Sequence, residues 1–237
     1  MRALLLAAGL GTRLRPITDT IPKCLVPING RPLIDYWFDL LFEAGVERAL
    51  VNTHYFADVV AAHIARSPWA ARIDLVREPA LLGTGGTIAA NRAYFGDAPF
   101  LVAHADNLTD FDVRTFLAAH TARPQGCAMT MLTFQTDDPR SCGVVELDER
   151  GVVLAFHEKV ADPPSDLANA AVYIIEPEVA AHAAGLGKPF VDLSTEVIPH
   201  FIGRILAVHH PGYHRDIGNP EALRKAEAEF PARRPEA

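Results

Sequence analysis

The feature that most constrains this chain is an apolar run near its start that breaks into glycines. Residues 4–8 are apolar without interruption, which is typical of a strand buried on both faces of a parallel sheet. Gly9 and Gly11 follow directly. Open α/β sheets bind phosphorylated ligands at such a turn, because missing Cβ atoms let backbone N–H groups approach phosphate oxygens. Arg13 and Lys23 add positive charge for the same oxygens. The stretch therefore predicts an α/β fold with a phosphate-binding turn.

The spacing of these glycines leaves more than one kind of turn open. Gly9 and Gly11 match the first two glycines of a dinucleotide-binding fingerprint, but Leu14 stands where the third would be. A nicotinamide dehydrogenase is also disfavoured because Asn52, not an acidic residue, ends the second predicted strand. A P-loop is excluded here, since the pattern G-x-x-x-x-G-K-[ST] does not occur. On these residues alone, an ordinary strand-to-helix turn fits as well as a phosphate loop.

Length and composition indicate one globular domain. The chain has 237 residues, of which 49% are hydrophobic and 22% are charged, the balance of an ordinary soluble protein. We expect a single domain over residues 1–230 and a flexible tail over residues 231–237. The formal net charge of −7 argues against a nucleic-acid partner. No apolar run is long enough to span a bilayer, so no membrane partner is expected.

The cysteines and the amino terminus bear on the cellular compartment. Cys24, Cys127 and Cys142 are scattered and odd in number, which predicts free thiols in a reducing environment. The chain begins directly with the apolar strand and lacks the parts of a secretory signal. Both observations predict a cytoplasmic protein.

Apolar periodicity predicts strands that alternate with helices along most of the chain. Strands are expected at 48–52, 72–76, 99–105, 127–134 and 205–208. Helices are expected at 31–44, 57–65, 88–94, 112–120, 192–201 and 221–229. This alternation predicts a mostly parallel sheet with helices on both faces. A turn-rich link joins the stretches 143–147 and 152–156, which predicts a hairpin that ends the regular pattern.

A second glycine-rich segment, residues 78–87, again follows a predicted strand and precedes a predicted helix. A flexible surface turn would explain its composition. Two such loops at the same edge of one sheet would instead bracket a ligand at the point where the strand order reverses.

Asp106 directly follows the strand predicted at 99–105. A carboxylate at the carboxyl tip of a central parallel strand points into the ligand crevice. Mg²⁺ takes one or two such carboxylates together with phosphates and waters. The other interpretation is a turn or helix-cap Asp before Asn107 and Thr109. Position alone leaves both interpretations open.

The glycine turn and the residues after it resemble a known family signature. Residues 7–16 read A-A-G-L-G-T-R-L-R-P and residues 22–27 read P-K-C-L-V-P. These strings are similar to the patterns G-x-G-[ST]-R-L-x-P-x-T and P-K-x-[ML]-[VL]-P of the sugar-1-phosphate nucleotidylyltransferases. The resemblance continues in family order from Leu4 to Pro220. It implies a Rossmann-like, GT-A-like nucleotidyltransferase fold: a mostly parallel central sheet flanked by helices, with the hairpin as a small sugar-covering subregion.

The resemblance implies a reaction that joins a nucleoside triphosphate to a sugar 1-phosphate and releases pyrophosphate. Its catalytic residues would be Arg13, Lys23, Asp106 and Asp216, and the two carboxylates would hold Mg²⁺. Asp216 lies in residues 212–220, which are similar to the family's W-x-D-I-G-[TN]-P. The triphosphate would be cradled by the first turn, through Ala7, Ala8, Gly9, Gly11 and Thr12.

The second glycine segment carries the information on the nucleobase. In the family the segment L-G-T-[AG]-G packs against the base, which implies that role for Leu82, Gly83, Thr84 and Gly85. Its form here looks more like that of guanylyltransferases acting on mannose or manno-heptose 1-phosphate. Members that select uridine or thymidine more often show Gln followed by Gly-Leu. Uridylyltransferases for N-acetylmuramate 1-phosphate share a Thr-Gly-Gly loop, so GTP is favoured and uridylyl transfer to an amino-sugar phosphate is the alternative.

Three later motifs would bind the sugar phosphate. The resemblance implies this role for Gly143, Glu158, Lys159 and Asn169. The chain departs from the family at three nearby positions, where Cys142, Val160 and Ala171 replace the usual Tyr, Pro and Gly. Ala105 also replaces the Gly that usually precedes the first metal-binding Asp. These departures bear on the identity of the sugar more than on the reaction. Without the resemblance, residues 158–159 would read as a solvated ion pair.

One alternative belongs to another class: a regulatory paralogue that binds sugar nucleotides without catalysis. Such a protein should have lost its charged groups, whereas the basic and acidic residues of the pattern are all present. The expected partners are therefore a nucleoside triphosphate and a sugar 1-phosphate, in the supply of capsule or lipopolysaccharide precursors. Monomer and homodimer both remain open.

Overall fold

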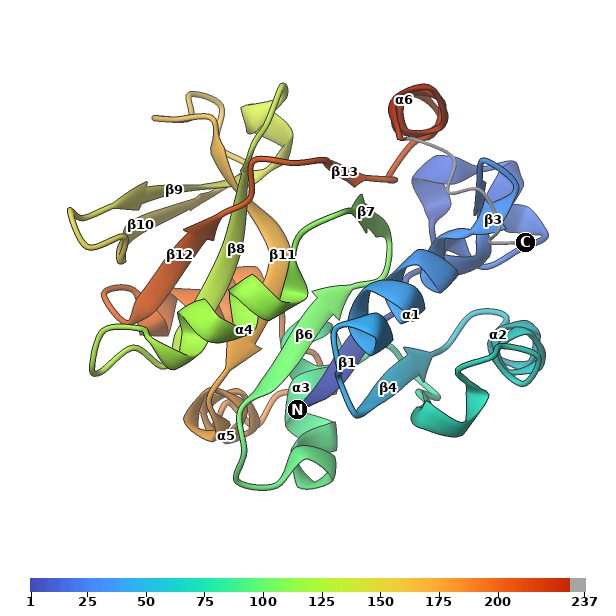
Figure 1. Cartoon of the computed structure of the whole chain (residues 1–237), viewed down its shortest axis with the longest axis horizontal. Helices are drawn as coiled ribbons and strands as arrows, with labels where there is room; N and C mark the ends of the chain where they lie inside the picture. Colours follow the sequence, from blue (N-terminus) through green and yellow to red (C-terminus); the bar gives the residue numbers. More distant parts are fainter. Residues whose placement is uncertain (231–237) are drawn as a thin grey trace.

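The computed structural model describes residues 1–230 and is built on a nine-stranded sheet (Figure 1). Its first half is parallel. Strand β1 (Arg2–Leu6) lies between β4 (Arg48–Thr53) and β6 (Phe100–His104), and β5 (Ile73–Arg77) pairs with the outer edge of β4. The predicted parallel sheet is confirmed in this half. Because parallel strands share one carboxyl edge, the segments after β1, β5 and β6 begin at the same side of the sheet.

The second half of the sheet is mixed. Strand β11 (Leu167–Ile175) runs antiparallel to both β6 and β8 (Met129–Gln135), and β12 (Ile205–His209) pairs in parallel with β8. The predicted hairpin is present as β9 (Gly143–Leu147) and β10 (Val153–Glu158), which pair antiparallel and join the sheet through β11. This half forms the upper left of Figure 1.

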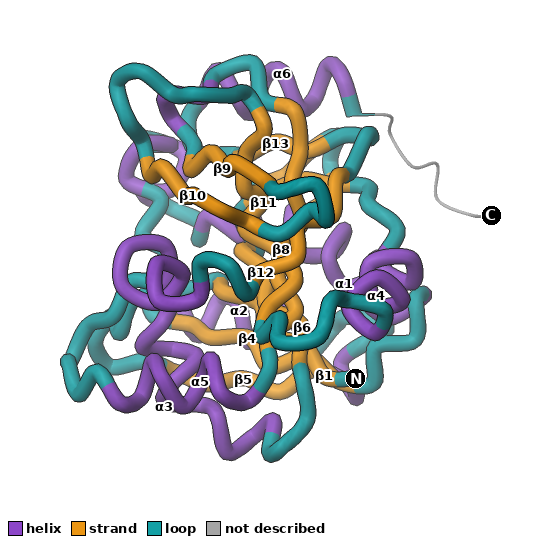
Figure 2. Tube along the Cα trace, turned by 90° about the vertical axis from the view of Figure 1, so that its left-hand side faces the viewer, coloured by secondary structure: helices purple, strands orange, loops and turns teal. Residues whose placement is uncertain are grey.

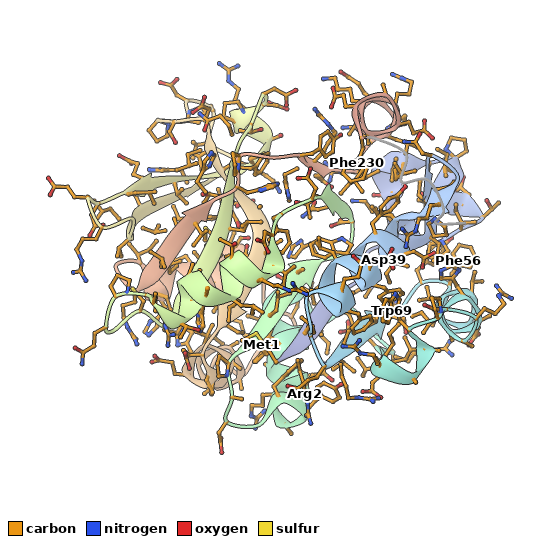
Figure 3. The ribbon with its side chains drawn as sticks, in the orientation of Figure 1. Met1, Arg2, Asp39, Phe56, Trp69 and Phe230 are labelled. Atoms are coloured by element: carbon orange, nitrogen blue, oxygen red, sulfur yellow. The ribbon has the colours of Figure 1, made fainter. Side chains whose placement is uncertain are left out.

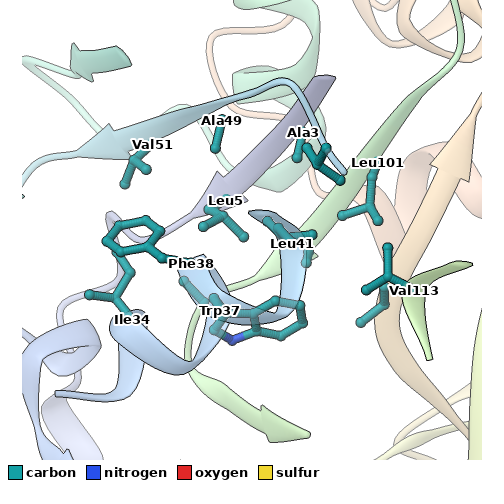
Figure 4. Close-up of a cluster of buried hydrophobic side chains, with 14 of the residues drawn as sticks. Ala3, Leu5, Ile34, Trp37, Phe38, Leu41, Ala49, Val51, Leu101 and Val113 are labelled. Atoms are coloured by element: carbon teal, nitrogen blue, oxygen red, sulfur yellow. The ribbon is translucent and has the colours of Figure 1, made fainter. Parts of the chain in front are cut away.

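One face of the sheet is covered by α1 (Leu33–Glu43), α2 (Ala57–Ile64) and α4 (Val113–Thr121). Figure 4 shows how Trp37 and its neighbours on α1 pack onto Leu5 of β1. These side chains are almost completely buried. Burial of one such side chain contributes about 1.5–3 kcal/mol, so this helix holds the first strand and the turn after it in place.

The other face is covered by α3 (Thr84–Phe95) and α5 (Pro177–Gly185). Leu4, the neighbour of Leu5 on β1, packs into this second core with Ile88 of α3. Figure 2 shows α3 and α5 on one side of the strands and α1 and α4 on the other. The apolar run at the start of the chain is thus buried on both faces, as its composition predicts.

A third core joins the end of the described chain to the first turn. It lies between α1, α6 (Pro220–Glu229) and two small sheets. One small sheet pairs β2 (Pro27–Ile28) with β3 (Arg31–Pro32), and the other pairs β7 (Asn107–Thr109) with β13 (His214–Asp216). Figure 3 marks Phe230 below α6, where its ring meets that of Tyr36 with centroids 5.6 Å apart.

Short helical turns complete the described part. Six are 3₁₀ turns: Thr12–Leu14, Ile17–Asp19, Lys23–Leu25, Ala70–Arg72, Pro139–Ser141 and Ile198–Phe201. Leu193–Val197 forms one π turn. Among the helices of residues 1–230, none combines the length and apolar character that a membrane crossing requires.

The expected elements are present with small shifts, and three differences matter for the site. The helix expected at 88–94 already begins at Thr84, so the last four residues of the second glycine segment are helical. The helix expected at 192–201 is a π turn followed by a 3₁₀ turn, although the Asp192 side chain does cap it by accepting from the Thr195 amide. Helix α5 and five strands, β2, β3, β7, β11 and β13, were not expected from the pattern. The tail expected at 231–237 lies outside the described residues.

Candidate active site

The two predicted metal-binding carboxylates lie together. Asp106 follows β6, and Asp216 ends β13, which pairs antiparallel with β7 directly after Asp106. The register places Asp216 opposite Asn107. The Ile217 amide donates to the Asp106 carbonyl at 3.0 Å, which holds the two segments side by side. A short strand pair thus brings a late residue to the carboxyl edge of the parallel strands.

Lys23 lies between these carboxylates. Its Nζ is 2.6 Å from Asp106 Oδ2 and 3.2 Å from Asp216 Oδ1, and its side chain is 8% exposed. Burial by itself would lower the pKa of Lys23, but the charges of the two carboxylates outweigh it and the net shift is upward. Burial would likewise raise the pKa of Asp106, and the Lys23 charge reverses that shift to a net lowering. Lys23 and Asp106 are therefore both charged at neutral pH.

Arg13 lies at the solvent side of the same cluster. Its Nη2 is 3.6 Å from Asp216 Oδ2, and its side chain is 69% exposed. Gly218 leaves room for this contact, since a Cβ there would be 2.7 Å from Asp216 Oδ2 and 2.9 Å from Arg13 Nη2. The four residues that the resemblance marks as catalytic thus lie together. Lys23 is buried, whereas the other three side chains are partly open to solvent.

The two carboxylates fit the set of ligands that Mg²⁺ takes from a protein. No group of three or more His, Cys, Asp or Glu residues able to hold a metal is found in residues 1–230. Asp106 and Asp216 are 34% and 52% exposed, so ligands from outside can complete a coordination shell. Mg²⁺ usually binds through one or two carboxylates, waters and substrate phosphates, which is the set available here.

The first glycine turn folds tightly at one end and stays open at the other. Gly11 has φ +64°, and a Cβ there would be 2.9 Å from Thr18 Cγ2. The Thr18 hydroxyl donates to the Gly11 carbonyl at 2.8 Å. Gly9 is different, because a Cβ there would meet nothing within 4 Å. Thr12 is exposed, as is Gly9, so this part of the turn is accessible to a ligand.

Two further residues predicted to bind nucleotide line the base of the turn. Ala8 is buried, and the Ala7 amide donates to Asn52 Oδ1 on β4 at 2.7 Å. That amide is therefore already bonded within the protein. The sequence did not predict the contact of Asn52 with the turn. It indicated only that the second predicted strand does not end in an acidic residue.

The second glycine segment is covered by residues 190–193. The amides of Gly85 and Gly86 donate to the Val191 carbonyl at 2.9 and 3.1 Å, and the Val191 amide donates to the Leu82 carbonyl at 2.9 Å. The Leu193 amide donates to Thr84 Oγ1 at 2.8 Å. The Gly85 amide is thus engaged inside the protein, and a base contact from this segment would have to use its other groups.

Two of these glycines are required because a side chain at either position would collide with the covering residues. A Cβ on Gly83 would be 2.4 Å from the Val191 carbonyl oxygen, and one on Gly85 would be 2.7 Å from Val191 Cγ1. Gly83 also has φ +75°. Sequence reasoning gave residues 192–196 no role, and only the cap residue Asp192 signalled structure there. We call residues 190–193 the covering segment.

The predicted sugar-side residues form two adjoining contacts. A Cβ on Gly143 would be 2.6 Å from Glu158 Oε2, so the glycine lets the strand lie against that carboxylate. Lys159 Nζ is 3.2 Å from Glu158 Oε1, and the lysine side chain is 64% exposed. Asn169 Nδ2 donates to the buried Tyr173 hydroxyl at 2.6 Å. Burial raises the pKa of Tyr173; the Asn169 bond opposes this shift and the nearby Glu158 charge adds to it.

A bulge in β11 connects this sugar side to the carboxylates. The pairing of β11 with β8 is irregular between Asn169 and Tyr173, and Ala171 there has φ +53°. A positive φ is strained for alanine and suits the glycine that the family usually has. The Asn107 side chain, next to Asp106, donates to the Ala170 carbonyl at 3.2 Å. The bulge is therefore hydrogen-bonded to the residue that directly follows Asp106 of the charged cluster.

Comparison with known proteins gives a consistent set of matches. Residues 2–233 match the family model described as nucleotidyl transferase. The chain is 32% identical over 233 residues to a mannose-1-phosphate guanylyltransferase of Mycobacterium tuberculosis, which covers 96% of this chain and 64% of that protein. It is 37% identical over 235 residues to an N-acetylmuramate alpha-1-phosphate uridylyltransferase of Caulobacter vibrioides, which covers 95% of each.

A solved structure with a nucleotide analogue has the same fold. HddC from Yersinia pseudotuberculosis, complexed with GMP-PN, superposes with a TM-score of 0.81 at 26% identity. The match covers 97% of this chain and 99% of that one. The chain thus spans almost all of this structure and of the Caulobacter relative, but 64% of the mycobacterial relative.

Proposed function

This chain belongs to the nucleotidyl transferase family, and we propose on that premise that it joins a nucleoside triphosphate to a sugar 1-phosphate with release of pyrophosphate. The observation that carries the proposal is the cluster at the carboxyl edge of the sheet. There Asp106 and Asp216 meet around Lys23 beside Arg13 and an open glycine turn. This is the arrangement that a reaction between two phosphate anions requires.

The chemistry follows from charge. A sugar 1-phosphate is already an anion at neutral pH, so its attack on the α-phosphate needs no general base. The barrier lies in bringing two polyanions together in line, which positioning and charge neutralisation lower. Lys23, fixed by two carboxylates, would neutralise charge at the α-phosphate, and the exposed Arg13 would do so at the outer phosphates and the leaving pyrophosphate.

We assign Asp106 and Asp216 as the residues that would hold Mg²⁺. When bound, the ion would supply further neutralisation of the reacting phosphates. Glu158 and Lys159 would orient the sugar phosphate, the carboxylate by accepting from sugar hydroxyls and the exposed ammonium by its charge. Gly143 and Asn169 would complete that side.

For the substrates we propose GTP and a mannose-type sugar 1-phosphate, either mannose or manno-heptose 1-phosphate. The guanylyltransferase relative and the HddC structure with GMP-PN support this choice. The Caulobacter relative supports the alternative, UTP with N-acetylmuramate 1-phosphate. It is more nearly identical to this chain than the mycobacterial relative is, and its length is close to that of this chain. In either case the product would be a nucleotide sugar made in the cytoplasm, as for capsule or lipopolysaccharide synthesis.

One panel of substrates tests both levels of the proposal. The purified protein is given each of GTP, UTP, dTTP, ATP and CTP with each of the three sugar 1-phosphates and Mg²⁺, and pyrophosphate release is measured. We expect GTP with mannose or manno-heptose 1-phosphate to be the best pair. A preference for UTP with N-acetylmuramate 1-phosphate would favour the alternative. No release above that of the Asp216→Asn variant with any pair would favour the non-catalytic paralogue.

A further inference from the structure

A buried polar network links the two glycine segments: Glu78 and Thr87 belong to the second, and Asn52 joins them to the first. Asn52 on β4, Glu78 after β5 and Thr87 on α3 are 3%, 3% and 1% exposed. A carboxylate at this depth is costly unless hydrogen bonds compensate for the lost water. Glu78 has no role in the charged cluster described above, and the reaction as proposed does not use it.

The hydrogen bonds of this network point toward the Glu78 carboxylate. Glu78 Oε1 accepts from Asn52 Nδ2 at 2.9 Å and from the Thr87 hydroxyl at 2.6 Å. Glu78 Oε2 accepts from the Leu82 amide at 3.4 Å. Each group that faces the Glu78 side-chain oxygens through these bonds is a donor.

Asn52 extends the network to the first glycine turn. Its Oδ1 accepts from the Ala7 amide at 2.7 Å, so its Nδ2 must face the other way, toward Glu78 and Thr87. A continuous path of hydrogen bonds therefore runs from the Ala7 amide through Asn52 and Glu78 to the Leu82 amide. Ala7 lies two residues before Gly9, and Leu82 lies directly before Gly83.

The backbone of Glu78 is held as well. Its amide donates to the Thr53 carbonyl at 2.8 Å, and its carbonyl lies 2.8 Å from His54 Nδ1. Glu78 is thus held through its backbone by Thr53 at the end of β4 and by His54. Its carboxylate bonds to Leu82 of the second segment and, through Asn52, is linked to Ala7 of the first. We propose that Glu78 is a positioning residue that sets the two glycine segments relative to each other around the nucleoside triphosphate, a role that rests on the proposed function.

A purely structural role would be the competing explanation, and the chain offers a matched control for it. Thr130 on β8 is fully buried, and its hydroxyl is 2.8 Å from Nδ1 of His120, which is 3% exposed. This pair lies in the second half of the sheet, away from the hydrogen bonds that join the two glycine segments. Thr130→Val removes a buried hydroxyl just as Thr87→Val does.

The test compares Glu78→Gln, Thr87→Val and Thr130→Val with the parent protein. The glutamine of the first variant would keep the volume of the glutamate and one acceptor, but its amide group would present a donor to one of the donors around it. We expect the KM for the triphosphate to rise about tenfold in Glu78→Gln and about threefold in Thr87→Val, because a misplaced loop weakens phosphate and base contacts. The KM for the sugar phosphate should change by less than about twofold. Thr130→Val should lower the melting temperature as Thr87→Val does and leave both KM values unchanged.

A second readout is independent of activity. Amide hydrogen exchange is followed in peptides covering residues 4–14 and 79–87. We expect faster exchange in both peptides of Glu78→Gln and no change in either for Thr130→Val. An equal rise of both KM values, or exchange in Glu78→Gln no faster than in Thr130→Val, would overturn the positioning role. If the parent protein were inactive in the substrate panel, the proposed function would fail while the exchange measurement still decided the link between the segments.

Discussion

The two glycine segments look alike in sequence, but the structure uses their glycines differently. Both follow parallel strands at the same edge of the sheet. In the first, Gly9 faces open space, so its missing side chain leaves room for a ligand. In the second, Gly83 and Gly85 lie against Val191 of the covering segment, so their missing side chains leave room for the chain itself. Glycine thus serves chain packing in the second segment, and we expect it to serve ligand binding in the first.

Charge follows the same division. Arg13 and Lys23 belong to the first segment and its extension, and their ion pairs reach the two carboxylates. The second segment is held by main-chain bonds to Val191, by the bond of the Leu193 amide to Thr84, and by the bond of its own Leu82 amide to Glu78. We therefore expect the first segment to take part in the chemistry and the second to act as a fixed wall of the site, and substitutions can separate these roles.

The largest effect is expected at the charged cluster beside the first segment. Asp106→Asn, Asp216→Asn and Lys23→Ala should each lower turnover about 10²-fold or more, about 2.7 kcal/mol or more, because each removes one preorganised charge. Steady-state pyrophosphate release measures this, and urea unfolding identifies any variant that loses activity by unfolding. Turnover close to that of the parent in all three variants would refute the assignment of the site.

The next effect is a loss of stability at the second segment. Gly83→Ala should lower the free energy of unfolding by about 2 kcal/mol or more, because alanine is strained at positive φ and its Cβ would collide with the Val191 carbonyl. Urea denaturation followed by far-UV circular dichroism gives this value. An unchanged unfolding midpoint would mean that the covering segment can move away, and that the second segment is not a fixed wall.

The sequence predicts the position of a site residue only where a recognisable element fixes that position. Asp106 and the first glycine turn could be placed because each directly follows an apolar strand, and parallel strands share one edge. Asp216 could be assigned only by resemblance. Its position depends on the pairing of β7 with β13, and strands of three residues are too short to show a periodicity.

The covering segment shows the limit more sharply. The hydrogen bonds of Val191 to the second glycine segment join main-chain atoms only, and such bonds leave no pattern of side chains in the sequence. The glycines were the only signal, and the same glycines are expected where a ligand binds. The early start of α3 was missed for a related reason: Gly85 and Gly86 disfavour a helix, but their bonds to Val191 stabilise its first turn.

Gly9→Ala is expected to have a smaller effect than Gly83→Ala, and to lower activity where Gly83→Ala lowers stability. Its Cβ would meet no protein atom within 4 Å and the backbone there has no positive φ, so stability should change by less than about 0.5 kcal/mol. The methyl group would instead occupy space through which a phosphate approaches, and kcat/KM for the triphosphate should fall about tenfold. Thermal unfolding and steady-state kinetics on one preparation test both parts. A loss of stability without a loss of activity would mean that Gly9 serves chain packing and not ligand binding, contrary to the contrast drawn between the two segments.

The smallest effect concerns the bond between Thr84 and the covering segment. Thr84→Val removes the acceptor of the amide of buried Leu193, which should cost about 1 kcal/mol of unfolding free energy, and Thr84→Ser should restore most of it. Because the second segment acts as a wall, the loosened contact should raise the KM for the triphosphate only about twofold and leave kcat unchanged. A large fall in kcat in Thr84→Val that Thr84→Ser rescues would place the second segment within the chemistry, and the division between the two segments would then be wrong.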